Sequence, residues 1–398
     1  MNPLLPLHMQ AEAELQAYDQ IQIVSTFGEP QAEYASIRKA AGLLDLPQRG
    51  LIEVTGPDRH VFLNNLLSNQ LYDKTAKRGL QAGQVVYTFL LNLRGRIVAD
   101  MSVIERGDLT YIETDGRLIP MLIDTLDKYL FAEKVKLRSC VGETYEIALH
   151  GPGALALISE VTSTPVSLTQ STNIRVTLFD TDTLIWRDDV CGVPGLHLIL
   201  PMNRVEHAWT HMLATFNAPA LADAPRSVRV RPVGWAAFNT ARIEAGRPFF
   251  DIDLPLSPPD RPGAKLRGEE VEAEVSKGAS PGILPAETGL MDRAVNLSKC
   301  YIGQEIVARM HARSAMAKKL VGIRMDQDFL PIAGSPVYDA DQNQIGTVTS
   351  STVSPVLSNA ALCLAVLKKP HFAEGTPVHI PAEGGIRPAR VVKIPFIV

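Results

Sequence analysis

The residues best suited to chemistry lie in the stretch Lys299–Arg309, which reads KCYIGQEIVAR. A cysteine stands beside a lysine, and apolar residues at helical spacing follow, so we expect Cys300 at the start of a helix. The N–H groups of a first helical turn and a neighbouring ammonium group both favour a thiolate. Cys300 is therefore a candidate nucleophile, redox relay or transient cluster ligand. The alternative is a buried cysteine that packs as a small apolar side chain.

Asp100 is the second candidate. Apolar runs at 84–91 and 97–104 flank turn residues and predict a β-hairpin that carries this carboxylate. In a dry site, Asp100 could accept a hydrogen bond or a proton from a ligand nitrogen. Otherwise it is an exposed hairpin carboxylate, as most aspartates are. Tyr87, on the same hairpin, either stacks on a ligand or packs in the core, which is the commoner role of an aromatic residue in a strand.

Charged residues form two further sets of candidate site residues. Arg242 and Glu244 lie two positions apart, on one side of the chain if this run is extended, and either contact a ligand or pair structurally. A basic run comprises Arg309, His311, Arg313, Lys318 and Lys319. Such a run is either a solvated face or a patch that docks an acidic partner or ligand tail.

The elements that must position these residues suggest a duplication. A strand, a Gly-Pro dipeptide and a helix occur at 51–67 and again at 145–158, which predicts two related α+β modules. We expect the first module at 1–140 and the second at 141–318, with a Pro/Gly-rich loop at 255–285. Short alternating runs between turn residues predict a small β-barrel at 319–398.

Composition restricts the class of protein. The 398 residues, 46% of them hydrophobic, suffice for two or three domains of about 150 residues. A net charge of -4 gives no overall attraction to nucleic acid or to an anionic membrane. No signal peptide and no apolar run of about 18 residues is visible, so we expect a cytoplasmic protein without nucleic-acid or membrane partners. The four cysteines lack metal-site spacing, so no stably bound metal is expected.

The stretch Lys299–Arg309 resembles the signature of the YgfZ family of folate-binding proteins, Lys-Gly-Cys-Tyr-x-Gly-Gln-Glu followed by an apolar pair and arginine. Upstream, 242–248 and 284–287 resemble that family's Arg-x-Glu-Ala-Gly-x-Pro and Leu-Pro-x-Glu motifs. The residues that match the signature are Lys299, Cys300, Tyr301, Gly303, Gln304, Glu305 and Arg309. One departure is the absence of the glycine between the lysine and the cysteine.

Nearly the whole chain also resembles the aminomethyltransferase (T-protein) of the glycine cleavage system, whose superfamily includes the YgfZ type. The segment 87–100 resembles the T-protein segment that ends in the catalytic aspartate, which falls on Asp100. Two ligand contacts of the T-protein, a glutamate and an arginine, fall on Val193 and Phe238. Their loss argues against glycine cleavage as the activity.

The resemblance implies an α+β fold with three domains in a cloverleaf. Two ferredoxin-like modules and a C-terminal β-barrel would surround an opening that binds tetrahydrofolate. A flat pterin suits an apolar slot with a few polar groups, and an acidic tail suits a local cation. The candidate folate contacts are Tyr87, Asp100, Arg242 and Glu244.

The function implied by the YgfZ resemblance is that of a folate-dependent accessory protein that is non-catalytic or weakly catalytic. It would support iron-sulfur cluster assembly or repair through the thiol of Cys300, with iron-sulfur client or assembly proteins as partners. The alternative is a tetrahydrofolate-dependent aminomethyl or methyl transferase with Asp100 as catalytic carboxylate. A third possibility is a scaffold that has kept the fold and lost the ligand.

Overall fold

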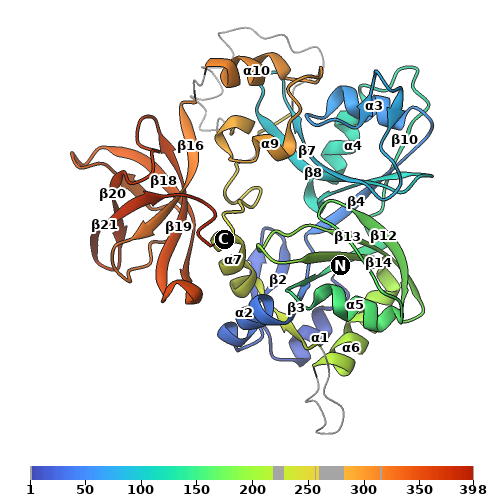
Figure 1. Ribbon diagram of the computed structural model, residues 1–398, viewed down its shortest axis with the longest axis horizontal. Coiled ribbons are helices and arrows are strands. Elements are labelled where there is room, and N and C mark those ends of the chain that lie inside the picture. The colour runs from blue at the N-terminus through green and yellow to red at the C-terminus, as the bar shows by residue number, and fades with distance from the viewer. Residues whose placement is uncertain (1, 218–227, 256, 260–281, 314–315, 398) are drawn as a thin grey trace.

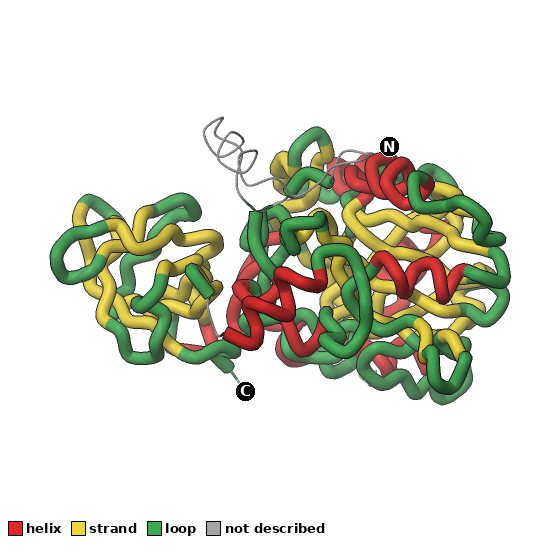
Figure 2. Tube along the Cα trace, turned by 90° about the horizontal axis from the view of Figure 1, so that it is seen from above, coloured by secondary structure: helices red, strands yellow, loops and turns green. Residues whose placement is uncertain are grey.

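Two lobes built on β-sheets and a separate β-barrel make up the computed structural model (Figure 1). Figure 2 shows the barrel at one end of the molecule, with helices between it and the sheets. The structure describes residues 2–217, 228–255, 257–259, 282–313 and 316–397. Most of the predicted loop at 255–285 lies outside these described residues.

The first lobe is an antiparallel sheet of five strands in the order β10-β4-β9-β8-β7. Its strands are β4 (Arg49–Thr55), β7 (Val85–Leu91), β8 (Ile97–Glu105), β9 (Thr110–Asp115) and β10 (Lys136–Ser139). Helices α3 (Arg59–Leu66) and α4 (Ile119–Asp127) pack on one face, against alternate apolar residues such as Ile52 and Val103. Because side chains alternate along a strand, the opposite face carries polar residues such as Asp100 and Glu113.

The second lobe is a sheet of six strands in the order β12-β13-β14-β11-β3-β15, in which β15 runs parallel to β3. Its strands are β3 (Ala41–Asp45), β11 (Thr144–His150), β12 (Asn173–Leu178), β13 (Thr181–Arg187), β14 (Gly195–Pro201) and β15 (Val230–Val233). Helices α5 (Ala154–Thr162) and α6 (Val205–Phe216) cover one face. Helices α2 (Pro30–Lys39) and α7 (Trp235–Glu244) pack on the other face near β3 and β15.

Strand β3 shows that the two lobes share the N-terminal part of the chain. Residues 42–45 pair antiparallel with 147–150 of β11, so part of the segment 1–140 belongs to the second sheet. The module boundaries at 140 and 318 stay predictions.

The repeated Gly-Pro dipeptides form corresponding turns in the two lobes. Gly56 follows β4 with φ 106°, and Gly151 follows β11 with φ 145°. A Cβ on Gly56 would lie 1.9 Å from the carbonyl oxygen of Lys134, and one on Gly151 would lie 2.3 Å from that of Ala40. Both turns therefore require glycine, for its positive φ and for the close backbone contact.

The β-barrel predicted at the C-terminus is confirmed. It is closed, in the order β16-β19-β18-β17-β20-β21. Its strands are β16 (Lys318–Met325), β17 (Pro336–Tyr338), β18 (Gln344–Ser354), β19 (Ala360–Lys368), β20 (Pro377–Ala382) and β21 (Gly385–Val392). Residues such as Ile323, Val348 and Leu367 fill its interior. Together with the two sheets, the barrel confirms the predicted fold class.

Shorter elements complete the structure. They are α1 (Leu5–Gln10), β1 (Glu14–Tyr18), β2 (Ile21–Thr26), β5 (Tyr72–Asp73), β6 (Arg78–Gly79), α9 (Met291–Ala294) and α10 (Gln304–Arg313). Short 3-10 helices occur at Gly116–Leu118, Met202–Arg204, Pro285–Glu287 and Pro355–Leu357. Among the described residues there is no helix with the length and apolar character that crossing a membrane requires.

Helix α7 joins the second lobe to the barrel through buried charges. Arg242 donates from Nη1 to Asp253 Oδ2 (2.6 Å) and from Nη2 to Ser350 Oγ of β18 (2.8 Å). The side chains of Arg242 and Asp253 are 0% exposed. Glu244 accepts hydrogen bonds from Tyr34 of α2 at 2.8 and 2.9 Å, and also from Ser354 of β18.

We expect the Arg242→Met variant to lose about 3–5 kcal/mol of unfolding free energy, because Asp253 would keep a buried, unpaired charge. Urea unfolding followed by circular dichroism measures the change. The matched control is Arg390→Met, which removes the surface pair between Arg390 and Asp326 and should leave the midpoint almost unchanged. Equal effects of the two substitutions would contradict this account of α7.

Candidate functional site

The two sheets pack with their strand faces together and leave a cavity of about 90 Å³ between them. Leu51 and Ile104 of the first sheet meet Leu184 and Ile199 of the second sheet in the apolar part of this interface. The polar lining from the first sheet comprises Arg49, Tyr87, Asp100, Ser102 and Glu113. The second sheet and the loop after β13 contribute the polar residues His150, Trp186, Asp188 and His197. Rings including Phe238 and Phe249 line the rest.

Asp100 and Tyr87 come together in this cavity. The phenol of Tyr87 donates to Asp100 Oδ2 at 2.9 Å, while Asp100 Oδ1 is buried and has no partner within the described ranges. Burial raises the pKa of Asp100, although Arg49 and the Tyr87 hydrogen bond oppose the shift. Burial and the charge of Asp100 raise the pKa of Tyr87 far above its usual value, so the phenol stays a donor. The reading of Asp100 as an exposed hairpin carboxylate is therefore wrong.

Glu113 adds a second carboxylate on the same sheet. Its Oε1 accepts from Arg49 Nε, whereas its Oε2 is buried without a partner among the described residues. Burial raises the pKa of Glu113 to about 7, with Arg49 acting against the shift and the charge of Glu146 adding to it.

His197 faces the cavity from the second sheet. Its Nδ1 lies 2.7 Å from Glu146 Oε1, its ring stacks on Trp186 at 4.2 Å, and its Nε2 has no partner in the described part of the chain. Burial alone would lower the pKa of His197, but the hydrogen bond and charge of Glu146 raise it. Burial lowers the pKa of the neighbouring His150 to about 3, so that ring is neutral.

Cations gather around Asp188 at one side of the cavity. Arg293 Nη2 donates to Asp188 Oδ2 at 2.7 Å, and Arg247 Nη2 lies 3.4 Å from Oδ1. Burial would raise the pKa of Asp188, but Arg293 holds it below the usual value. The Arg293 guanidinium also lies 4.5 Å from the centre of the Tyr87 ring.

Sequence reasoning missed most of the polar lining of this cavity. Arg49, Glu113, His197 and Asp188 were not among the predicted site residues. One signal was available, because His197 interrupts the apolar strand GLHLIL at 195–200 and thus places a polar side chain on an otherwise apolar strand.

Cys300 lies outside the cavity lining. It is exposed, in contrast to the buried Cys140, Cys191 and Cys363, so the interpretation of Cys300 as a core residue is wrong. The expected helix start at Cys300 is also wrong, because α10 begins at Gln304.

The lysine beside Cys300 has a structural contact of its own. Lys299 Nζ donates to the carbonyl oxygens of Leu67 and Asn69, the residues that follow α3. Burial lowers the pKa of Lys299 to about 7.

The rest of the Lys299–Arg309 stretch supports the hairpin that carries Asp100. Gly303 has φ 79°, and a Cβ there would lie 2.4 Å from the carbonyl oxygen of Asn92 in the turn between β7 and β8. Tyr301 is buried in an apolar cluster with Phe89 of β7, and burial raises its pKa to about 12. Gln304 begins α10, while Glu305 and Arg309 are exposed on it.

The remaining predicted site residues lie elsewhere. Arg242 and Glu244 are on helix α7, not on an extended strand, and their side chains contact the barrel and α2 as described above. In the basic run, Lys318 Nζ donates to the carbonyl oxygen of Gly282 at 3.0 Å, and the side chain of Arg313 is not among those described. Within the described ranges, no group of three or more His, Cys, Asp or Glu residues is placed to hold a metal ion.

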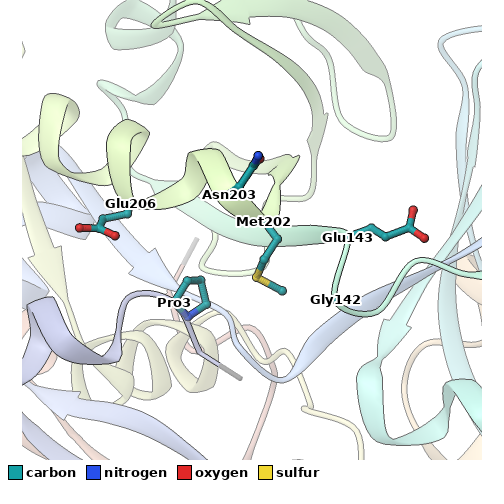
Figure 3. Close-up of a pocket in the computed structure, with 6 residues that line it drawn as sticks. All are labelled: Pro3, Gly142, Glu143, Met202, Asn203 and Glu206. Carbon is teal, nitrogen blue, oxygen red and sulfur yellow. The ribbon is translucent and has the colours of Figure 1, made fainter.

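A more open pocket of about 550 Å³ lies beside α6, and it contains none of the predicted site residues. Its lining comprises Pro3, Gly142, Glu143, Met202, Asn203 and Glu206. Figure 3 shows its two carboxylates, Glu143 and Glu206, pointing away from each other. The convergent polar groups are in the smaller cavity between the sheets, which is the candidate site.

Two protein-family models match this chain, one over most of the two lobes and one over the barrel. The family model of the GCVT N-terminal domain matches residues 4–257, and that of the glycine cleavage T-protein C-terminal barrel domain matches 318–397. An aminomethyltransferase of Shouchella clausii is 28% identical over 400 residues, covering 99% of this chain and 96% of that protein. An aminomethyltransferase of Saccharopolyspora erythraea is 27% identical over 369 residues, covering 92% of this chain and 89% of that protein.

A solved structure is similar in fold. The crystal structure of the glycine cleavage system aminomethyltransferase T from Bartonella henselae superposes with a TM-score of 0.80, at 22% identity, covering 99% of this chain and 97% of that one.

Proposed function

This chain belongs to the family defined by the GCVT N-terminal domain, and we propose that it binds tetrahydrofolate in the cavity between its two sheets. The observation that carries the proposal is a set of buried polar atoms that lack partners among the described residues. They are Asp100 Oδ1, Glu113 Oε2, Trp186 Nε1 and His197 Nε2. Buried polar atoms are costly to leave unpaired, so a ligand with both donors and acceptors fits this cavity.

The size of the cavity limits what enters it. At about 90 Å³ it is smaller than the roughly 300–1,000 Å³ of typical ligand pockets, so only the pterin head would lie between the sheets. The rings of Phe238 and Phe249 give this slot apolar walls. Arg247, whose side chain is 25% exposed, supplies a cation for the acidic tail where the slot opens.

The residues of the chain have separate roles in this proposal. Tyr87 orients Asp100 through Oδ2 and leaves Oδ1 to accept an N–H of the ligand. Arg49 holds Glu113 through Oε1 and leaves Oε2 to accept a second N–H of the ligand. Bound tetrahydrofolate supplies nitrogen atoms that can carry a one-carbon unit. Apolar walls limit the access of water, which strengthens each of these hydrogen bonds.

For the role of the bound folate, we propose an accessory protein of the YgfZ type that supports iron-sulfur cluster assembly or repair. Cys300 favours this role because its thiol is exposed and open to a partner protein. Burial raises the pKa of Cys140 to about 11 and that of Cys191 to about 12, and it also raises that of Cys363, which makes these three thiols poor nucleophiles. Val193 and Phe238, at positions of T-protein ligand contacts, agree with a role outside glycine cleavage.

A tetrahydrofolate-dependent aminomethyl or methyl transferase is the second candidate. It is favoured by the position of Asp100, a half-buried carboxylate whose Oδ2 is held by Tyr87 and whose Oδ1 is buried and unpaired within the described ranges. Such a carboxylate can exchange a proton with a nitrogen of the ligand or of a transferred group.

Calorimetric titration with tetrahydrofolate under anaerobic conditions tests the binding site. We expect binding by the wild type and an affinity at least about tenfold weaker for Asp100→Asn, because a hydrogen bond to a charged acceptor is lost. The control Asp341→Asn makes the same change on the barrel surface and should bind as the wild type does. If the wild type takes up no tetrahydrofolate, the proposed function is wrong.

A steady-state assay with tetrahydrofolate and an aminomethyl or N-methyl donor tests the transferase candidate. This candidate predicts turnover that falls about a hundredfold or more in Asp100→Asn, since a positioned acid-base group contributes about 10²–10⁴ to the rate. Turnover by the wild type no faster than by the variant would leave only the accessory role.

Complementation of a strain that lacks its own iron-sulfur accessory factor tests the thiol. We expect Cys300→Ala to abolish complementation and to leave tetrahydrofolate affinity nearly unchanged, because Cys300 is exposed and outside the cavity lining. The control Ser298→Ala alters a neighbouring exposed side chain and should complement fully. Full activity of the alanine variant at position 300 would rule out a role for the thiol.

A further inference from the structure

We propose that His197, oriented by Glu146, is a hydrogen-bond and proton donor to the ligand in the central cavity, opposite the acceptor Asp100. This inference rests on the proposed function and extends it to residues of the second sheet. It assigns donors to one wall of the cavity and acceptors to the other.

Geometry supports a ligand-facing role for the outer nitrogen of His197. Glu146 holds Nδ1 at 2.7 Å from its Oε1, so Nδ1–H is the donor in that pair and Nε2 is on the free edge of the ring. Nε2 has no accessible surface and no partner in the described part of the chain, although 13% of the side chain is exposed. The stacked indole of Trp186 fixes the ring plane and has its own Nε1 buried and unpaired within those ranges.

Charges around the imidazole favour its protonated form. Glu146 lies on β11, Glu113 on β9 of the facing sheet, and Asp188 follows β13, and all three raise the pKa of His197 against the effect of burial. The other titratable ring in contact is His150 on β11, 5.7 Å away between ring centres and neutral because burial lowers its pKa to about 3. In its protonated form, the imidazole presents Nε2–H to the cavity.

The proton balance is simple. When a ligand nitrogen or oxygen takes the proton, the Nε2–H bond breaks, a bond from hydrogen to the ligand forms, and the electron pair stays on Nε2. Nδ1–H remains hydrogen-bonded to Glu146, which stays ionised. The ligand that fits has an acceptor atom toward β14 and an N–H group toward Asp100 on β8.

A purely structural ion pair is the competing explanation. His197 and Ala148 are opposite one another on neighbouring strands, so the bond to Glu146 also spans β11 and β14. A structural pair predicts lower stability when it is removed, but no change in how ligand binding depends on pH. The pH dependence of binding thus separates the two explanations.

The test is calorimetric titration of the full-length protein with tetrahydrofolate between about pH 6 and 8, the range in which histidine changes charge. We expect wild-type affinity to fall as pH rises, because the donor at Nε2 is lost above the pKa of His197. His197→Gln should bind roughly tenfold more weakly at the acidic end and lose this dependence. His211→Gln, the same change at an exposed position of α6, should behave as the wild type.

Two further variants assign the titrating group. Glu146→Gln removes the carboxylate that raises the pKa of His197, so the fall in affinity should move to lower pH. Glu113 has a pKa of about 7 and titrates in the same range, so Glu113→Gln must keep a fall in affinity if His197 is the group, moved toward lower pH because the charge of Glu113 also raises the pKa of His197. Loss of the dependence in Glu113→Gln with retention in His197→Gln would overturn the inference.

Nitrogen NMR of the wild-type protein reports the protonation state of His197 directly. This measurement needs neither a folded variant nor folate. Because its pKa is raised, we expect His197 to be protonated on both nitrogens at the acidic end of this range, at about pH 6, and a neutral ring throughout the range would overturn the inference. If the wild type binds tetrahydrofolate and His197→Gln binds equally with the same pH dependence, the inference fails and the proposed function stands. If the wild type binds none, the proposed function fails, and this inference with it.

Discussion

Burial of charged strand faces between two sheets is the constraint on which the rest of the structure depends. Each sheet covers one face with helices through apolar residues and turns its other face toward the other sheet, and α2 and α7 cover that face of the second sheet only near β3 and β15. Leucine and isoleucine side chains seal part of this interface, whereas Asp100, Glu113 and His197 occupy another part of it. Buried charges are tolerated only where partners compensate them. The paired oxygens of Asp100 and Glu113 hold these side chains in place, and their unpaired oxygens identify the candidate site.

The segment Lys299–Arg309 and the pair Arg242 and Glu244 lie outside the cavity lining and contact the elements around it. The Lys299–Arg309 stretch packs Gly303 and Tyr301 against the hairpin of β7 and β8, and Lys299 contacts the end of α3. Arg242 and Glu244 connect α7 to the barrel and to α2. Both sets therefore lie on or contact elements that contribute to the cavity lining, since β7 carries Tyr87 and α7 carries Phe238.

Cavity and thiol are separate features of one chain. The cavity between the sheets is lined by the carboxylates of Asp100 and Glu113 from one sheet and by the rings of Trp186 and His197 from the other, and each of these side chains has a buried polar atom without a partner in the described part of the chain. Cys300 is exposed and outside that lining, so a reaction at its thiol would involve a molecule that approaches from solvent.

The sequence by itself determined several elements and two residues of the candidate site. Apolar runs around turn residues predicted the hairpin with Tyr87 and Asp100, short alternating runs between turn residues predicted the barrel, and the repeated Gly-Pro marked two lobes. Only the tertiary structure decided that His197 and Glu113 line the same cavity as Asp100 and that Glu146 pairs with His197, because strand pairing and sheet packing join residues far apart in the chain. It also decided the surroundings of Cys300, since exposure depends on neighbouring segments that local sequence does not specify.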